Sequence, residues 1–108
     1  MIYTNSRYAH LMAADEADKY KRLSQDLEEF FQGNKPSEGD LAVAPILENY
    51  SLIDRPVFAL QGTVFGHPTI MDGPLLSSEV VLFDPVHRWM RTRSRYYRLG
   101  HARPRDGA

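Results

Sequence analysis

The sequence predicts an α+β fold, in which a long N-terminal amphipathic helix and a short second helix pack on a three-stranded antiparallel β-meander. In the first third of the chain, apolar residues recur every three or four positions, as they do along one side of a helix. Residues 57–99 are instead rich in β-branched and aromatic residues and are divided by glycine and proline turns, which is typical of strands. The 108 residues and 43% hydrophobic content suit a single domain over residues 1–108 with one core.

The first helix is expected over about residues 6–32. Acidic residues stand three or four positions before basic ones, an order that stabilises helices, and Gly33 and Asn34 predict the C-terminal stop. We expect its apolar stripe to pack into the core rather than to bind a partner. The stripe consists of Tyr8, Leu11, Met12, Ala17, Tyr20, Leu23, Leu27, Phe30 and Phe31.

A short second helix is expected near residues 36–44. Ser37 is a candidate N-terminal cap, and Pro45 ends the segment because a proline disfavours helix in the residue before it. The helical part of the domain therefore covers about residues 6–50, the β part covers about residues 57–100, and residues 102–108 are expected to form a flexible tail.

Three strands are expected over about residues 57–65, 75–83 and 89–99. Turn-forming residues separate them, at 66–74 and at Asp84-Pro85. Gly62 lies inside the first strand and suggests a bulge or the close approach of another backbone.

The segment from Arg88 to Gly100 has the most unusual composition. It holds five arginines, two tyrosines and the only tryptophan, and no acidic residue occurs from Pro85 to Arg105. A helix would align Arg88, Arg91, Arg95 and Arg98, whereas a strand would place Trp89, Arg91, Arg93, Arg95 and Tyr97 on one face. We favour the strand, because the preceding segments are strands joined by short turns.

Charge is distributed unevenly along the chain, although the net charge is only −1. Residues 1–54 carry five basic and ten acidic residues, a net of −5, and residues 55–108 carry eight basic and four acidic residues, a net of +4. This polarity indicates a basic working face, or two halves that neutralise each other within one fold.

The sequence offers little catalytic chemistry. Cysteine is absent, and the four histidines show no metal-ligand spacing, so we expect no metal and no cofactor. His67 and Asp72 are the best acid–base pair and mark a candidate ligand loop, although turn formation explains the same loop. No apolar run approaches the roughly 20 residues of a membrane span. We therefore expect a non-enzymatic cytoplasmic protein that does not bind membranes.

Two kinds of partner suit the basic segment. Guanidinium groups bind phosphates and aromatic rings stack on unpaired bases, which predicts nucleic-acid binding, although the pI of 6.4 is low for that class and known nucleic-acid-binding motifs are absent. The alternative is an interaction module or regulatory adaptor for an acidic protein, because Arg, Trp and Tyr are enriched at protein interfaces. Contact between an acidic helix and a basic sheet would also permit a homo-oligomer. The predicted site is Arg88, Trp89, Arg91, Arg93, Arg95, Tyr97 and Arg98.

The chain also resembles a family of small uncharacterised alphaproteobacterial proteins, a domain of unknown function. The resemblance lies in Gly66-His67-Pro68, Asp72-Gly73 and the run Trp89-Met90-Arg91-Thr92-x-Ser94-Arg95-x-Tyr97-Arg98-Leu99-Gly100. The chain departs from the family at Ser77-Ser78-Glu79, Met90 and Tyr50, where Thr-Ser-Pro, Ala and Trp are common. The resemblance implies a bacterial protein with one compact domain and assigns no function.

Overall fold

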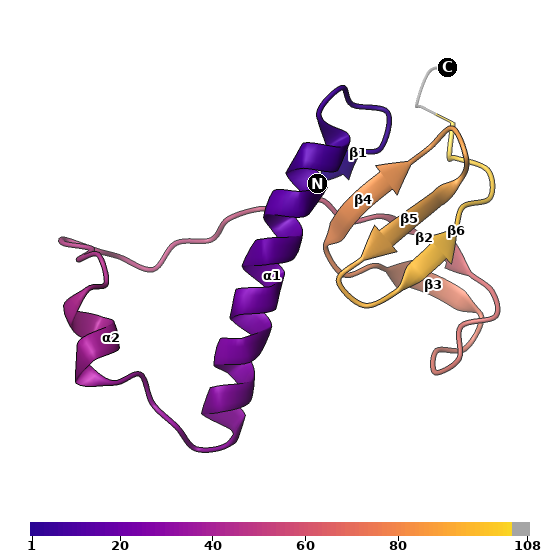
Figure 1. Ribbon diagram of the computed structural model, residues 1–108. Helices are drawn as coiled ribbons and strands as arrows, with labels where there is room; N and C mark the ends of the chain where they lie inside the picture. Colours follow the sequence, from indigo (N-terminus) through magenta and orange to yellow (C-terminus); the bar gives the residue numbers. More distant parts are fainter. Residues whose placement is uncertain (105–108) are drawn as a thin grey trace. The chain divides into compact units, whose positions relative to one another are not determined.

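The structure, a computed structural model, describes residues 1–104 and has an α+β fold (Figure 1). Its elements are β1 (Ile2–Tyr3), α1 (Ala9–Phe31), α2 (Glu38–Ala42), β2 (Gln61–Val64), β3 (Gly73–Leu76), β4 (Val80–Asp84), β5 (Trp89–Thr92) and β6 (Tyr96–Arg98). Residues 105–108 of the predicted tail lie outside the described residues.

The chain divides into two compact units. The β unit comprises Met1–Ala9 and the chain from Pro56 onward, and the helical unit is His10–Arg55. The predicted single domain, and the predicted packing of the long helix on the sheet, therefore stay predictions.

Both predicted helices are confirmed in the helical unit. Lys19 pairs with Asp15 at 3.0 Å along α1, and Gly33 follows the helix with a φ of 88°, a conformation that glycine adopts without steric cost. At α2, Ser37 Oγ accepts the backbone N–H of Asp40 at 3.0 Å, and the Asp40 carboxylate accepts the backbone N–H of Ser37 at 3.0 Å. This reciprocal cap explains why a helix of five residues begins there.

The larger sheet of the β unit has four strands in the order β1-β4-β5-β6 (Figure 1). Strands β4, β5 and β6 are antiparallel to their neighbours, while β1 pairs in parallel with β4. The prediction of a three-stranded meander is therefore wrong. Strand β1 escaped prediction because two residues are too short to show a period, and its pairing partner lies about 80 residues away.

The strand predicted at residues 75–83 is two strands in two sheets. Between β3 and β4, the N–H of Ser77 donates to the carbonyl of Leu60 at 2.8 Å, and the N–H of Val80 donates to the carbonyl of Phe58 at 2.8 Å. Strand β3 pairs with β2 in the smaller sheet, and β4 pairs with β1 and β5 in the larger one. The chain thus changes sheets at residues 77–79, where the backbone remains hydrogen-bonded to the segment before β2.

Only the second half of the strand predicted at residues 57–65 is a regular strand, namely β2. Gly62 lies opposite Leu75 in an uninterrupted antiparallel register, and no atom lies within 4 Å of the position that a Cβ would occupy there. The predicted bulge or close backbone approach at Gly62 is therefore wrong.

Val80, Met90 and Thr92, the most deeply buried residues of the β unit, lie on one side of the larger sheet. These residues are 1%, 4% and 1% exposed. An irregularity in the register between Val80 and Leu82 places Val80 and Phe83 on this same side of β4.

Candidate functional site

The arginine-rich segment is extended, as predicted, but it forms two strands rather than one. Thr92 and Arg95 flank the turn between β5 and β6, where the N–H of Thr92 donates to the carbonyl of Arg95 at 2.9 Å. The hydroxyl of Thr92 accepts the N–H groups of Ser94 and Arg95 at 3.1 and 3.2 Å. This side chain takes the place of a backbone acceptor and holds the turn.

The hairpin decides which side chains share a face. Trp89 lies opposite Arg98, and Arg91 lies opposite Tyr96. Because opposite residues in an antiparallel pair lie on the same side, these four residues form one surface, the outer face of β5–β6. Met90 lies opposite Tyr97, so this second pair is on the other, inner side.

Tyr96 is at the centre of the outer face. The guanidinium carbon of Arg91 lies 5.1 Å from the centroid of its ring, within range of a cation–π interaction. The ring of Trp89 meets that of Tyr96 edge to face, with centroids 5.9 Å apart and an interplanar angle of 62°. Tyr96 nevertheless remains 66% exposed.

Three of the predicted site residues lie elsewhere. Arg93 is exposed in the turn, and its N–H donates to the carbonyl of Glu79 at 3.0 Å. Arg95 lies opposite Thr92 and is half-buried, and Tyr97 is half-buried on the inner side, 6.2 Å from the ring of His67. The predicted continuous row is wrong, because the two-residue turn after Thr92 reverses the chain and resets the alternation.

Trp89 and Arg91 thus share a face as predicted, while Arg98, which a single strand would place on the opposite face, joins them because the turn reverses the chain. Tyr96 takes the place predicted for Tyr97. The one sequence signal for the turn that causes this exchange is Ser94, a turn-favouring residue in the middle of the segment.

Arg88 lies just before β5 in the turn that starts at Asp84. Its φ of 59° is uncommon for any residue other than glycine, and its carbonyl accepts the N–H of Leu99 at 2.9 Å. Arg88 is exposed next to the outer face.

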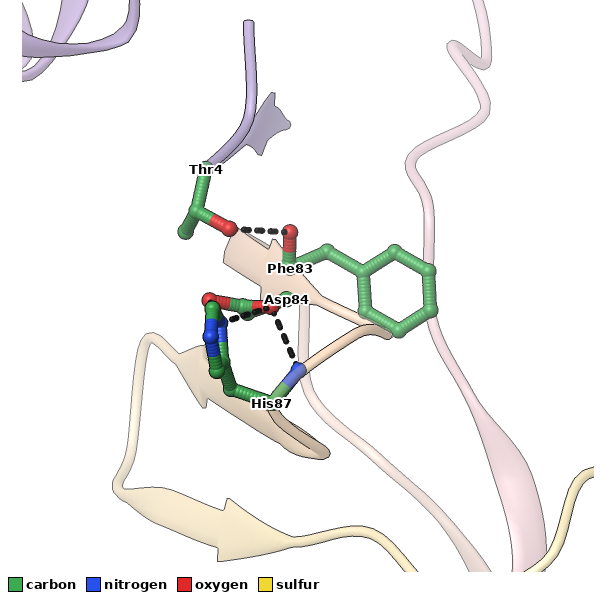
Figure 2. A network of polar contacts seen from close by, with 4 residues as sticks. All are labelled: Thr4, Phe83, Asp84 and His87. Carbon is green, nitrogen blue, oxygen red and sulfur yellow. Dashed lines mark hydrogen bonds and ion pairs between the residues drawn. The ribbon is translucent and has the colours of Figure 1, made fainter.

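Asp84 holds the same turn together (Figure 2). Its carboxylate accepts the backbone N–H of His87 at 2.9 Å and the ring Nδ1–H of His87 at 3.0 Å. The bond from the backbone N–H of His87 is the main reason that the pKa of Asp84 is lowered, and burial opposes it. Thr4, which follows β1, donates its hydroxyl to the carbonyl of Phe83 at 3.4 Å. These contacts all lie at the C-terminal end of β4, next to the turn.

The β unit carries an excess of positive charge. Seven arginines and three carboxylates lie in residues 1–9 and 56–104, a net of +4. Two of those carboxylates, Asp72 and Asp84, accept backbone N–H groups in their turns. Within this described unit, none of the arginines forms an ion pair.

The candidate ligand loop places His67 and Asp72 in separate hydrogen bonds. Asp72 accepts the N–H of Gly66 at 2.9 Å, and Nδ1 of His67 accepts the N–H groups of Thr69 and Ile70, each at 3.1 Å. Both side chains therefore stabilise the loop backbone, and ligand binding there stays a prediction.

Neither a metal centre nor a membrane span is found in residues 1–104. No three side chains of the metal-binding types come together there, and neither helix in this range is long and apolar enough to cross a bilayer.

Comparison with known proteins identifies the family of the chain. No curated protein and no solved structure matches it significantly. A family model does match, over residues 14–105, which include most of α1, all of α2 and strands β2 to β6. The expected membership in an uncharacterised family is confirmed at that level: the chain belongs to the Family of unknown function (DUF6634).

Proposed function

We propose that the chain binds nucleic acid through the outer face of β5–β6, with Arg88 beside it, and that it acts without catalysing a reaction. The observation that carries the proposal is the composition of this face, on which Tyr96 and Arg98 are exposed and Trp89 and Arg91 are half-buried. Two arginines and two aromatic rings share it, and neither arginine has a carboxylate partner among the described residues of the β unit.

This composition suits a polyanion with aromatic bases. A guanidinium group stays charged at any physiological pH and donates two parallel hydrogen bonds to a phosphate. The net charge of +4 on the described β unit adds a local attraction for a polyanion at this surface. Tyr96 and Trp89 supply ring surface that can contact a base once the phosphates are bound.

A non-enzymatic role is consistent with the hydrogen bonds of the acid–base candidates. His67 and Asp72 bind different backbone groups rather than each other. His87 and Asp84 are bonded to each other within one turn, where the carboxylate also holds the backbone. Both pairs therefore serve the shape of their loops.

An acidic protein is the second candidate partner. Strand β6 is at the edge of the four-stranded sheet, so one side of its backbone is available to an added strand. Arg98 and Tyr96 on that strand would then contact acidic side chains of the partner, in an adaptor or in a homo-oligomer.

We also propose a cytoplasmic location in a bacterium. The support is the resemblance of residues 66–68, 72–73 and 89–100 to the alphaproteobacterial proteins described above.

The test is fluorescence anisotropy with labelled single-stranded DNA, duplex DNA and RNA at about 50 and about 200 mM salt. The variant is Arg91→Ala/Arg98→Ala, and the control is Lys21→Ala/Lys35→Ala, which removes the same charge from the helical unit. We expect affinity to fall with salt, and the arginine variant to reduce the slope of log K against log salt by about two, as the loss of two phosphate contacts requires.

The control variant should bind like the wild type. Absence of binding to all three nucleic acids at the lower salt concentration would refute the proposal. Equal weakening by both double variants would show that net charge, and not this face, determines binding.

A further inference from the structure

We infer that the ligand of the outer face is single-stranded nucleic acid, with one unpaired base stacked on the ring of Tyr96. The inference rests on the proposed function and specifies its ligand. It is carried by the position of Tyr96, by the width of the sheet and by the rigidity of the hairpin.

Tyr96 has an aromatic surface that its neighbours leave open. Arg91 contacts the ring at 5.1 Å from its centroid, and Trp89 contacts it edge to face, yet two-thirds of the residue is exposed. A base can stack on such a ring whatever its identity, because every base has a π-face. In a duplex these faces are already stacked on neighbouring bases, so only an unpaired base can use Tyr96 in this way.

The sheet is too wide to enter the major groove with this face. Four neighbouring strands at about 4.8 Å span about 14 Å of backbone before side chains are added. The major groove is about 12 Å wide and admits a ribbon of two strands. A duplex can therefore meet this surface only through its phosphates, whereas a single strand can lie across it with bases and phosphates in contact.

The hairpin holds the stacking residue in place before any ligand binds. Tyr96 is paired with Arg91, and the turn before it is fixed by the hydroxyl of Thr92. A preformed surface loses little conformational entropy on binding. Arg98 and Arg88 both lie on the side of Tyr96 away from the turn, Arg98 on the same strand and Arg88 at the open end of the hairpin, where they can bind the phosphates that follow the stacked base in one direction.

Trp89 supplies a direct measurement, because it is the only tryptophan of the chain and touches Tyr96. The full-length protein is titrated with unlabelled oligothymidine of about 12 nucleotides and with a duplex of the same length, while tryptophan fluorescence is recorded. We expect the single strand to quench Trp89 and to bind more tightly than the duplex.

Substitutions then separate stacking from charge. Tyr96→Ala should weaken binding of the single strand roughly 5- to 100-fold, the loss expected for one base–aromatic stack, and leave duplex binding unchanged. Tyr96→Phe keeps the ring and should bind like the wild type. Tyr50→Ala removes a tyrosine that is 80% exposed in the helical unit, and it should have no effect. Circular dichroism of each variant checks that it is folded.

The outcomes distinguish this inference from the proposed function. Equal binding of single strand and duplex without quenching of Trp89 would overturn the single-strand inference and leave nucleic-acid binding in place. Weakening by Tyr96→Phe as large as that by Tyr96→Ala would assign the contact to the hydroxyl and would overturn stacking. Absence of binding to either nucleic acid would overturn both.

Discussion

Thr92 is a polar side chain at the buried centre of the β unit. It is 1% exposed, and its hydroxyl accepts two backbone N–H groups of the turn that precedes Tyr96. A hydroxyl is tolerated at this depth because its hydrogen bonds are made, and its loss leaves two part-buried N–H groups without this acceptor. One residue thus determines the reversal that gives the outer face its composition.

We expect Thr92→Val to lower the free energy of unfolding by about 1–3 kcal/mol, since valine keeps the volume and removes the acceptor. Thr63→Val in β2 is the control, because Thr63 is exposed, and it should change stability by less than about 0.5 kcal/mol. Urea denaturation followed by tryptophan fluorescence measures both. A Thr92→Val variant as stable as the control would show that the hydroxyl is dispensable.

The lowered pKa of Asp84 predicts a dependence of stability on acid. The hydrogen bonds of the folded state favour the ionised carboxylate of Asp84, so Asp84 stabilises the fold at pH values above its ordinary pKa of 3.8. This stabilisation disappears as the pH falls through the lowered pKa of the folded state. Asp84→Asn keeps an acceptor for the N–H of His87 and removes the charge. We expect the variant to melt at a lower temperature than the wild type at pH 7, and the difference to vanish below the lowered pKa. A difference that stays constant between pH 7 and strong acid would contradict this account.

Ser77 connects two elements that belong to different sheets. Its N–H donates to the carbonyl of Leu60, and its hydroxyl accepts the N–H of Leu60 at 2.9 Å and donates to the carbonyl of Ser78 at 2.8 Å. The Ser77 side chain therefore supplies hydrogen-bond partners for backbone groups at the place where β3 ends and β4 begins. Neighbouring Ser78 is exposed, and its hydroxyl meets that of Ser94 at 2.9 Å.

We expect Ser77→Ala to destabilise the protein by about 1–2 kcal/mol, because it leaves the N–H of Leu60 without its side-chain acceptor. Ser78→Ala, one residue further, should cost less than about 0.5 kcal/mol, since water replaces an exposed hydroxyl contact. Thermal unfolding of the two variants compares them directly. Equal losses of stability in the two variants would mean that the passage of the chain from one sheet to the other does not depend on the Ser77 hydroxyl.

At the scale of the whole molecule, the two units differ in charge as well as in structure. The β unit carries a net charge of +4, while the helical unit carries five basic and ten acidic residues, a net of −5. The boundary between the two compact units thus nearly coincides with the boundary between the acidic and the basic part of the chain, at residues 55–56. This agreement places the positive excess in the unit that holds the outer face.

We expect the two units to unfold at different urea concentrations, because each has its own internal contacts. Fluorescence of Trp89 reports the β unit, and circular dichroism at helical wavelengths reports mainly α1, the longest helix. The helical signal should be lost first, since α1 has mainly local contacts within its unit. Superimposable curves from both signals would show one cooperative unit instead.

The sequence by itself determined the local features of this protein. The two helices and their ends, the extended conformation of residues 89–92 and 96–98 and the separation of charge all follow from neighbours within a few positions, through hydrogen bonds, caps and periodicity. Trp89 and Arg91 could be assigned to one face for the same reason, whereas the place of Arg98 beside them could not.

Only the tertiary structure decided how the strands pair. Strand β1 joins the sheet through a partner about 80 residues away, and β3 and β4 separate because Leu60 and Phe58 bind the backbone between them. The choice of Tyr96 over Tyr97 for the outer face depends on the turn that Thr92 holds. Such pairings are contacts between distant segments, and a period of two within one segment cannot reveal where the chain reverses or changes sheets.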